Sequence, residues 1–177
     1  MNELIRRISR TTPVPLILRV IVFLSALLAL WLAAPAQAST PRLILLMAFL
    51  AALPGLFPGT RVVDFVMVSV LIGWVATTLA VGEPAEPLRV FGIATALYVS
   101  HSAAALAAVV PYDAVVDTQV PLRWAARCGL VIMGGGLVTA AVVVIARSVV
   151  PGRSVLVLLA GLGVAIGTVA MLSRRRS

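Results

Sequence analysis

Long runs without a charged residue dominate this sequence and divide it into six apolar intervals. A helix rises about 1.5 Å per residue and the hydrocarbon core of a bilayer is about 30 Å thick, so roughly 20 apolar residues cross it. The intervals cover residues 20–41, 43–60, 65–82, 90–112, 128–146 and 154–173, and each is 18 to 23 residues long. We therefore predict an all-α bundle of six transmembrane helices, with spans near 14–34, 43–60, 62–82, 90–111, 126–146 and 154–173.

The second interval has the weakest helical pattern. Its end is crowded by Pro54, Gly55, Pro58 and Gly59, which leave only residues 43–53 as an uninterrupted helix former. This pattern fits a short or kinked span, and it also fits a re-entrant hairpin. All the intervals are apolar on every side, which excludes the alternating pattern of a membrane β-barrel.

The composition excludes a water-soluble globule, because 62% of the residues are hydrophobic, 11% are charged and the mean hydropathy is +1.13. Fourteen cations, all of them arginine, outnumber six acids and give a net charge of +8. In a soluble chain this excess would suggest nucleic-acid binding. Here the arginines stand at the ends of apolar runs, where they meet anionic headgroups. We therefore expect the lipid bilayer as a partner and no nucleic acid.

The arginines also predict how the chain is oriented. With six spans, nine arginines lie on the side of the two termini and four on the opposite side, and arginine favours the cytoplasmic side. We therefore predict a multi-pass plasma-membrane protein with cytoplasmic N- and C-termini. Arg19 lies about one turn inside the first span, from where its side chain can extend back to the headgroups. The nine are Arg6, Arg7, Arg10, Arg61, Arg123, Arg127, Arg174, Arg175 and Arg176, and the four are Arg42, Arg89, Arg147 and Arg153.

Residues 1–38 allow a second interpretation. A basic stretch, an apolar region and Ala36-Gln37-Ala38 before Ser39 also describe a secretory signal peptide with a small-residue cleavage site. Cleavage there would leave five spans and the same orientation for each of them. The position of Arg19 close to the apolar region, and the immediate return of another hydrophobic segment, favour an uncut first helix.

His101 is the only histidine, and it falls at the middle of the fourth interval, where an ionisable group is costly unless it is paired. At 100° per residue it shares about a third of the helix circumference with Thr95, Tyr98 and Ser102. A functional interpretation is a proton relay or ligand site, because histidine changes its charge near physiological pH. The structural alternative is a neutral histidine that hydrogen-bonds to a neighbouring helix, and the absence of an intramembrane acid favours it.

Arg61 and Asp64 stand at the start of the third interval and are three residues apart, which places them on one helix face. They are candidates for a substrate anchor or a pore gate. An interfacial ion pair is the favoured interpretation, because aspartate also suits the positive N-terminal end of a helix dipole. Asp113 and Asp117 are two acids in a short loop, fewer than a metal site normally recruits, so we expect no metal.

Small residues predict where helices pack. Gly163 and Gly167 form a GxxxG spacing in the sixth interval, which lets two helix backbones approach closely. In the fifth interval Gly135 shares a face with Cys128 and Thr139. We expect these two spans to pack through their small faces. The single cysteine has no partner for a disulfide and is interpreted as a packing residue.

The sequence lacks every familiar catalytic motif of a membrane enzyme. It contains no H-E-x-x-H pair, no G-x-S-x-G elbow, no phosphate-binding loop that ends in Gly-Lys, and no paired-cysteine or multi-histidine arrangement for a metal or haem. We therefore expect no catalytic residue and no cofactor. The loops are also too short to hold a soluble domain.

The stretch from Tyr98 to Arg127 carries a resemblance to a known group of proteins. Its features are Tyr98-Val-Ser-His101-Ser followed by alanines, then Pro111, Asp117, Pro121-Leu-Arg-Trp124 and Arg127. In these it resembles small uncharacterised polytopic membrane proteins of high-GC Gram-positive bacteria, some of them encoded beside MoxR-type AAA ATPases. The resemblance implies a bacterial source and an accessory role at the cell envelope, and it implies no catalytic residue.

Two functions from different classes follow. The first is a non-enzymatic accessory or structural subunit of a cell-envelope or transport assembly, bound to a membrane-protein partner or to a second copy of itself through lateral helix contacts. The second is a small transporter or proton-coupled permease whose pathway passes His101.

Overall fold

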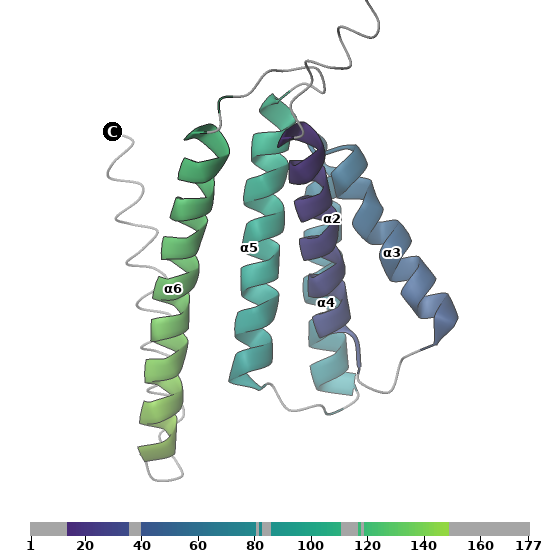
Figure 1. Ribbon diagram of the computed structural model, residues 1–177. Helices are drawn as coiled ribbons and strands as arrows, with labels where there is room; N and C mark the ends of the chain where they lie inside the picture. The colour runs from purple at the N-terminus through teal and green to yellow at the C-terminus, as the bar shows by residue number, and fades with distance from the viewer. Residues whose placement is uncertain are drawn as a thin grey trace, which may run out of the picture. The chain divides into compact units, whose positions relative to one another are not determined.

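The computed structural model describes residues 14–35, 40–80, 82, 86–110, 117 and 119–148, with side chains up to residue 145. This part of the chain contains five α-helices and no strand. They are α2 (Val14–Ala33), α3 (Pro41–Leu56), α4 (Val62–Ala80), α5 (Pro87–Val109) and α6 (Gln119–Ser148), shown in Figure 1. Residues 1–132 and 133–177 form two separate units, and the boundary falls within α6.

Four segments are long and apolar enough to cross a membrane. They are α2, α4, α5 and residues Gln119–Ile145 of α6, whereas α3 is shorter, with 16 residues. The chain is therefore an all-α membrane protein, as its composition predicts. Six spans remain a prediction, because the second interval forms this short helix and the sixth, 154–173, lies outside the described residues.

Helix α2 forms the centre of the first unit and contacts α3, α4 and α5. Its inward positions carry many small residues, and the side chains of Val22 and Ala29 are completely shielded from solvent. Small side chains let helix backbones approach closely, which is how helices gain packing energy when lipid removes the hydrophobic driving force between them. The main core cluster joins all four helices through Ala29, Ala51, Val70 and Ala96.

Helix α3 begins sharply and passes through a proline. The side-chain oxygen of Thr40 accepts a hydrogen bond from the Leu43 amide, and Pro41 occupies the first turn, where its missing N–H costs nothing. The helix continues through Pro54 and ends at Leu56, three residues beyond the stretch that its sequence marks as an uninterrupted helix former. Pro54 removes one backbone donor and crowds the carbonyl one turn earlier, and both Pro54 and Gly55 are buried within the bundle.

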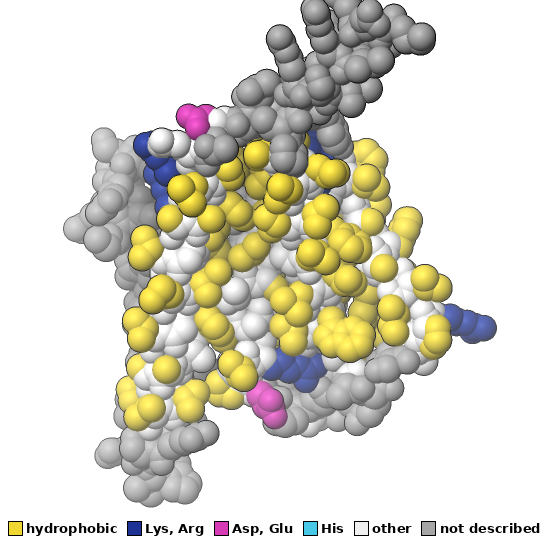
Figure 2. Space-filling view, in the orientation of Figure 1, with side chains coloured by type: hydrophobic (Ala, Val, Ile, Leu, Met, Phe, Trp, Pro, Cys, Tyr) yellow, Lys and Arg dark blue, Asp and Glu magenta, His cyan; other side chains and the backbone are white. Residues whose placement is uncertain are grey.

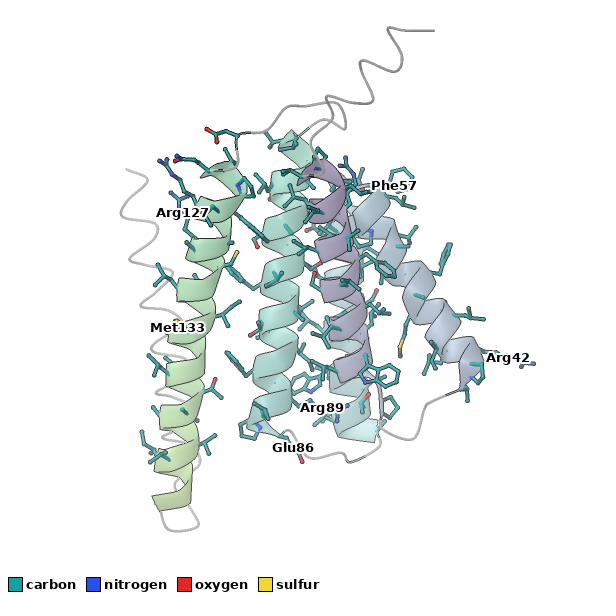
Figure 3. The ribbon with its side chains drawn as sticks, in the orientation of Figure 1. Arg42, Phe57, Glu86, Arg89, Arg127 and Met133 are labelled. Atoms are coloured by element: carbon teal, nitrogen blue, oxygen red, sulfur yellow. The ribbon has the colours of Figure 1, made fainter. Side chains whose placement is uncertain are left out.

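Successive helices of the first unit run in opposite directions. At one end the last turn of α2 meets the last turn of α4 and the first turn of α5, through Thr77 and Arg89. At the other end Gly55, near the end of α3, lies against the first half of α2. We call these the Arg89 end and the Arg61 end. Figure 3 shows Arg42, Glu86 and Arg89 at the former, and Phe57 and Arg127 at the latter.

The outer surfaces of the helices are apolar. Figure 2 shows hydrophobic side chains over the visible helices and charged side chains near the helix ends. Leu45, Phe49, Phe65 and Leu79 expose between 62% and 79% of their surface. Such exposure is unfavourable in water and is expected of side chains that contact lipid.

Candidate functional site

A cleft of about 310 Å³ opens at the Arg61 end, between the α3–α4 turn, the start of α4 and one face of α5. Both apolar and ionisable side chains line it. The turn and α4 contribute Pro58, Gly59, Thr60, Arg61, Val63 and Asp64, and α5 contributes His101, Ala104 and Ala105. The cleft therefore unites the two sites that the sequence indicates separately, the histidine of the fourth interval and the charged pair of the third.

The α3–α4 turn fixes the mouth of the cleft. The Thr60 hydroxyl donates a hydrogen bond of 2.8 Å to the Phe57 carbonyl and accepts one of 3.4 Å from the Val62 amide. These bonds hold the first turn of α4, whose backbone amides have no carbonyl partner within the helix. Val63 then packs into a core cluster with Val22, so its neighbour Asp64 points outward.

Arg61 and Asp64 both line the cleft, and their side chains are exposed. Within the described part of the chain, neither side chain forms a hydrogen bond or an ion pair with another residue. The structure thus places the two opposite charges in the same cleft, Arg61 directly before α4 and Asp64 in its first turn, without a closed ion pair between them. The two groups are free to bind a ligand of mixed charge.

His101 lies closer to one end of the helix bundle than its place in the sequence suggests. It stands eight residues before Val109, the end of α5, which corresponds to about 12 Å. It shares the cleft with Asp64, which belongs to the first turn of α4. The α3–α4 turn meets the last turn of α5, since a Cβ added at Gly59 would lie 3.6 Å from the Ala108 Cβ. His101 is exposed and lines the cleft about two helical turns inward from the end of α5.

The polar face of α5 divides between two neighbours. Ser102 lies 3.5 Å from Cys128 of α6, measured from hydroxyl oxygen to sulfur, and Tyr98 also interacts with this thiol. His101 faces the cleft instead. Thr95 is half-buried and forms no side-chain hydrogen bond with another described residue. The four residues therefore do not form one site: Tyr98 and Ser102 interact with the buried Cys128 at the α5–α6 contact, His101 lines the cleft, and Thr95 belongs to neither.

The Arg89 end carries a set of contacts that the sequence analysis missed. The Arg89 guanidinium donates hydrogen bonds of 2.7 Å to the carbonyls of Leu32 and Ala34. The Thr77 hydroxyl donates one of 3.0 Å to the Ala33 carbonyl between them. Three successive carbonyls at the end of α2 are therefore bound by side chains of α4 and α5.

This arrangement satisfies groups that every helix end leaves without an intrahelical partner. The last carbonyls of a helix also carry the negative end of its dipole, which a cation stabilises. The available signal in the sequence is that Arg89 stands in the first turn of its own helix, where a cation is unfavourable. A cation in such a position serves another element, and here that element is α2.

The predicted packing glycines fall in the second unit. In α6 the Thr139 hydroxyl donates a hydrogen bond of 2.9 Å to the Gly135 carbonyl. A side chain added at the neighbouring Gly134 would meet no other atom within 4 Å. Gly163 and Gly167 lie outside the described residues.

The described residues contain no group of three or more side chains of the types that bind metals. No protein-family model matches the chain, and it matches no curated protein and no solved structure. Inferences about function therefore come from the residues and contacts above.

Proposed function

We propose that this protein is a non-enzymatic accessory or structural subunit of a cell-envelope or transport assembly in a bacterial plasma membrane. The supporting observation is the exposure of α6. In the apolar 18-residue window of Gln119–Ile145 only 6% of residues are buried, against 39% in α2. Among the described residues this helix leaves most of its surface without a neighbour, which is room for the predicted sixth span and for a partner, and Gly134, Gly135 and Gly136 permit close backbone approach.

The partner is a membrane protein or a second copy of the chain. The resemblance of residues 98–127 to small membrane proteins encoded beside MoxR-type AAA ATPases supports the envelope setting. Purification in a mild detergent, followed by mass spectrometry, tests the proposal. We expect a partner, or a second copy, in fixed stoichiometry with the chain. A monodisperse protomer without any partner would contradict the proposal.

Substitution of a glycine locates the interface. Gly134→Leu adds a large side chain at a position of α6 where a Cβ meets no atom within 4 Å, and it should release the partner. Gly73→Leu is the matched control, because Gly73 of α4 also has nothing within 4 Å of an added Cβ. Loss of the partner in both variants would show that the contact is not specific to α6.

The proposed orientation places the Arg61 end and both termini in the cytoplasm. Among the described residues, α2 and α6 carry Arg19, Arg123 and Arg127 in their first halves and Arg61 directly precedes α4, all towards the Arg61 end, while the Arg89 end carries Arg42 and Arg89. This bias agrees with the preference of arginine for the cytoplasmic side. Reporter fusions after Arg61 and after Gly82 should report cytoplasmic and external positions respectively, and the reverse result would invert the topology.

The central position of α2 supports an uncut first helix. Loss of residues 1–38 would remove Leu18, Val22 and Ala29 from the core and leave α3, α4 and α5 without their common neighbour. We expect the protein isolated from membranes to retain residues 14–33, which intact-mass measurement decides. A mature chain that begins at Ser39 would establish the signal-peptide interpretation instead.

A second candidate function is a small transporter or proton-coupled permease with a pathway near His101. The observation in its favour is the cleft, where His101 lies with Arg61 and Asp64. In liposomes, a relay histidine should lose pH-dependent proton-coupled flux on His101→Gln while the protein stays folded. If neither the flux nor its pH dependence changes, the pathway does not use this residue.

A further inference from the structure

The charges in the cleft point to a ligand that carries both signs. Arg61 offers a permanent cation, Asp64 an acid, and His101 an imidazole, and all three line the same cleft of about 310 Å³. A simple anion would bind Arg61 but would be repelled by Asp64. A metal cation would face the opposite problem, and two potential ligands are too few to hold it. A zwitterion satisfies both charges.

The position of the cleft indicates where this zwitterion comes from. Helix α4 has 19 residues and is about 28 Å long, close to the thickness of the hydrocarbon core. Its first turn, with Asp64, therefore lies at the level of the lipid headgroups. Large exposed apolar side chains adjoin the lining residues in the sequence: Leu56 and Phe57 precede Pro58, Phe65 follows Asp64, and the three expose 53% to 62% of their surface. A ligand there has its polar part in the cleft and apolar chains beside these residues.

We propose that the cleft binds the phosphoethanolamine headgroup of a membrane lipid. The phosphate meets Arg61, whose planar guanidinium suits two phosphate oxygens, and accepts an N–H from His101. The primary ammonium meets Asp64 and donates hydrogen bonds to its carboxylate. A choline headgroup has a cation without N–H donors, and a glycerol headgroup has no cation, so both should bind more weakly.

The lipid-binding proposal requires only that the chain spans a membrane, and it does not depend on the proposed accessory role. Either proposal can therefore be contradicted while the other stands. The test uses the full chain, purified in detergent and freed of lipid. Native mass spectrometry then counts bound lipids after addition of phosphatidylethanolamine, phosphatidylcholine and phosphatidylglycerol with identical acyl chains. We expect a preference for phosphatidylethanolamine of about three- to tenfold, the range for a partly exposed charge-assisted contact.

Variants assign the preference to the cleft. Asp64→Asn should abolish the preference for phosphatidylethanolamine over phosphatidylglycerol, because it removes the acceptor for the ammonium. Arg61→Gln should weaken both lipids, because both carry the phosphate. The matched controls are Asp117→Asn and Arg42→Gln, two exposed charges outside the cleft, which should keep the wild-type preference. Unchanged circular dichroism and elution volume establish that each variant is folded.

Free O-phosphoethanolamine separates the lipid from a soluble ligand with the same headgroup. If millimolar O-phosphoethanolamine displaces the lipid, the cleft recognises the headgroup alone. If it does not, recognition includes the apolar chains, and both results support the assignment. Equal retention of the three lipids would overturn it, and so would a preference that survives Asp64→Asn.

Discussion

Two arginines near the starts of adjacent helices have opposite surroundings at the two ends of the bundle. Arg89 is half-buried and binds two carbonyls of α2, whereas Arg61 is exposed and lines an open cleft. At the Arg89 end, the side chains of Arg89 and Thr77 bind the last carbonyls of α2. At the Arg61 end, a cation, an acid and a histidine stand together without closing on each other.

The difference shows how a membrane protein can separate stability from binding. Buried polar contacts between helices are costly to break, because a group left without a partner has no water to bind. Exposed charges at the headgroup level contribute little to stability and remain available for a ligand. Substitutions at the Arg89 end should therefore affect folding, and those at the Arg61 cleft should affect binding.

The largest expected effect comes from Arg89→Ala. It removes two charge-assisted hydrogen bonds and leaves two carbonyls at the end of α2 unbound, so the free energy of unfolding should fall by about 2–3 kcal/mol. Unfolding by SDS in mixed micelles measures it. Arg89→Lys keeps the positive charge but loses the planar guanidinium that donates to two carbonyls at once. It should recover about half of the unfolding free energy that Arg89→Ala loses. Arg42→Ala, an exposed arginine of α3, is the control and should stay close to wild type.

A second experiment compares how tightly the two ends pack. The Cβ added by Gly55→Ala would lie 3.2 Å from the Arg19 carbonyl oxygen, a backbone atom that cannot move aside. We expect a loss of about 1–2 kcal/mol. At the Arg89 end, Gly92→Ala would meet only the Leu32 Cδ1 atom, at 3.0 Å, and this flexible side chain can rotate. In the same micelle assay, Gly55→Ala should therefore lose clearly more unfolding free energy than Gly92→Ala. A reversed order would contradict the tighter packing of α3 on α2.

Thr77→Val should have a smaller effect. It keeps the shape of the buried side chain and removes the hydrogen bond to Ala33, a contact that within membranes averages about 0.6 kcal/mol. Combined with Arg89→Ala, it forms a double-mutant cycle. Because the bound carbonyls are adjacent, we expect the combined loss to differ from the sum of the single losses. Strict additivity would mean that the two side chains act independently.

The smallest effect on stability should come from the cleft itself. Arg61→Gln and Asp64→Asn remove exposed charges without a partner among the described residues, so each should change the free energy of unfolding by less than about 0.5 kcal/mol. Equilibrium unfolding of both variants, measured beside Arg89→Ala, decides the point. A loss as large as that of Arg89→Ala would remove the distinction between the two ends.

Hydrophobicity alone predicts most of the described fold. The long apolar intervals correspond to α2, α4, α5 and α6, because twenty apolar residues have few stable alternatives to a membrane helix. A helix can also extend beyond the span that its charged boundaries predict. Helix α6 begins at Gln119, before the predicted 126, since Pro121 is tolerated in a first turn and the exposed Arg123 and Arg127 continue the helix towards the headgroups.

The candidate site could be predicted only in part. The spacing of Arg61 and Asp64 places them together, since three residues on a helix are a local relation. That His101 lines the same cleft depends on how α5 is aligned with α4. This is a tertiary relation, which no local sequence pattern predicts. The contacts of Arg89 also join residues far apart in the sequence, because its partners lie 55 and 57 residues earlier in the chain.

That separation has a consequence for biosynthesis. Ribosomes extend a chain by about 5–20 residues per second, so Arg89 is made roughly 3–11 s after the helix end that it binds. Throughout this interval the carbonyls of Leu32 and Ala34 must keep their bonds to water. The first hydrophobic helix therefore enters the bilayer early but reaches its final contacts late, when α5 arrives.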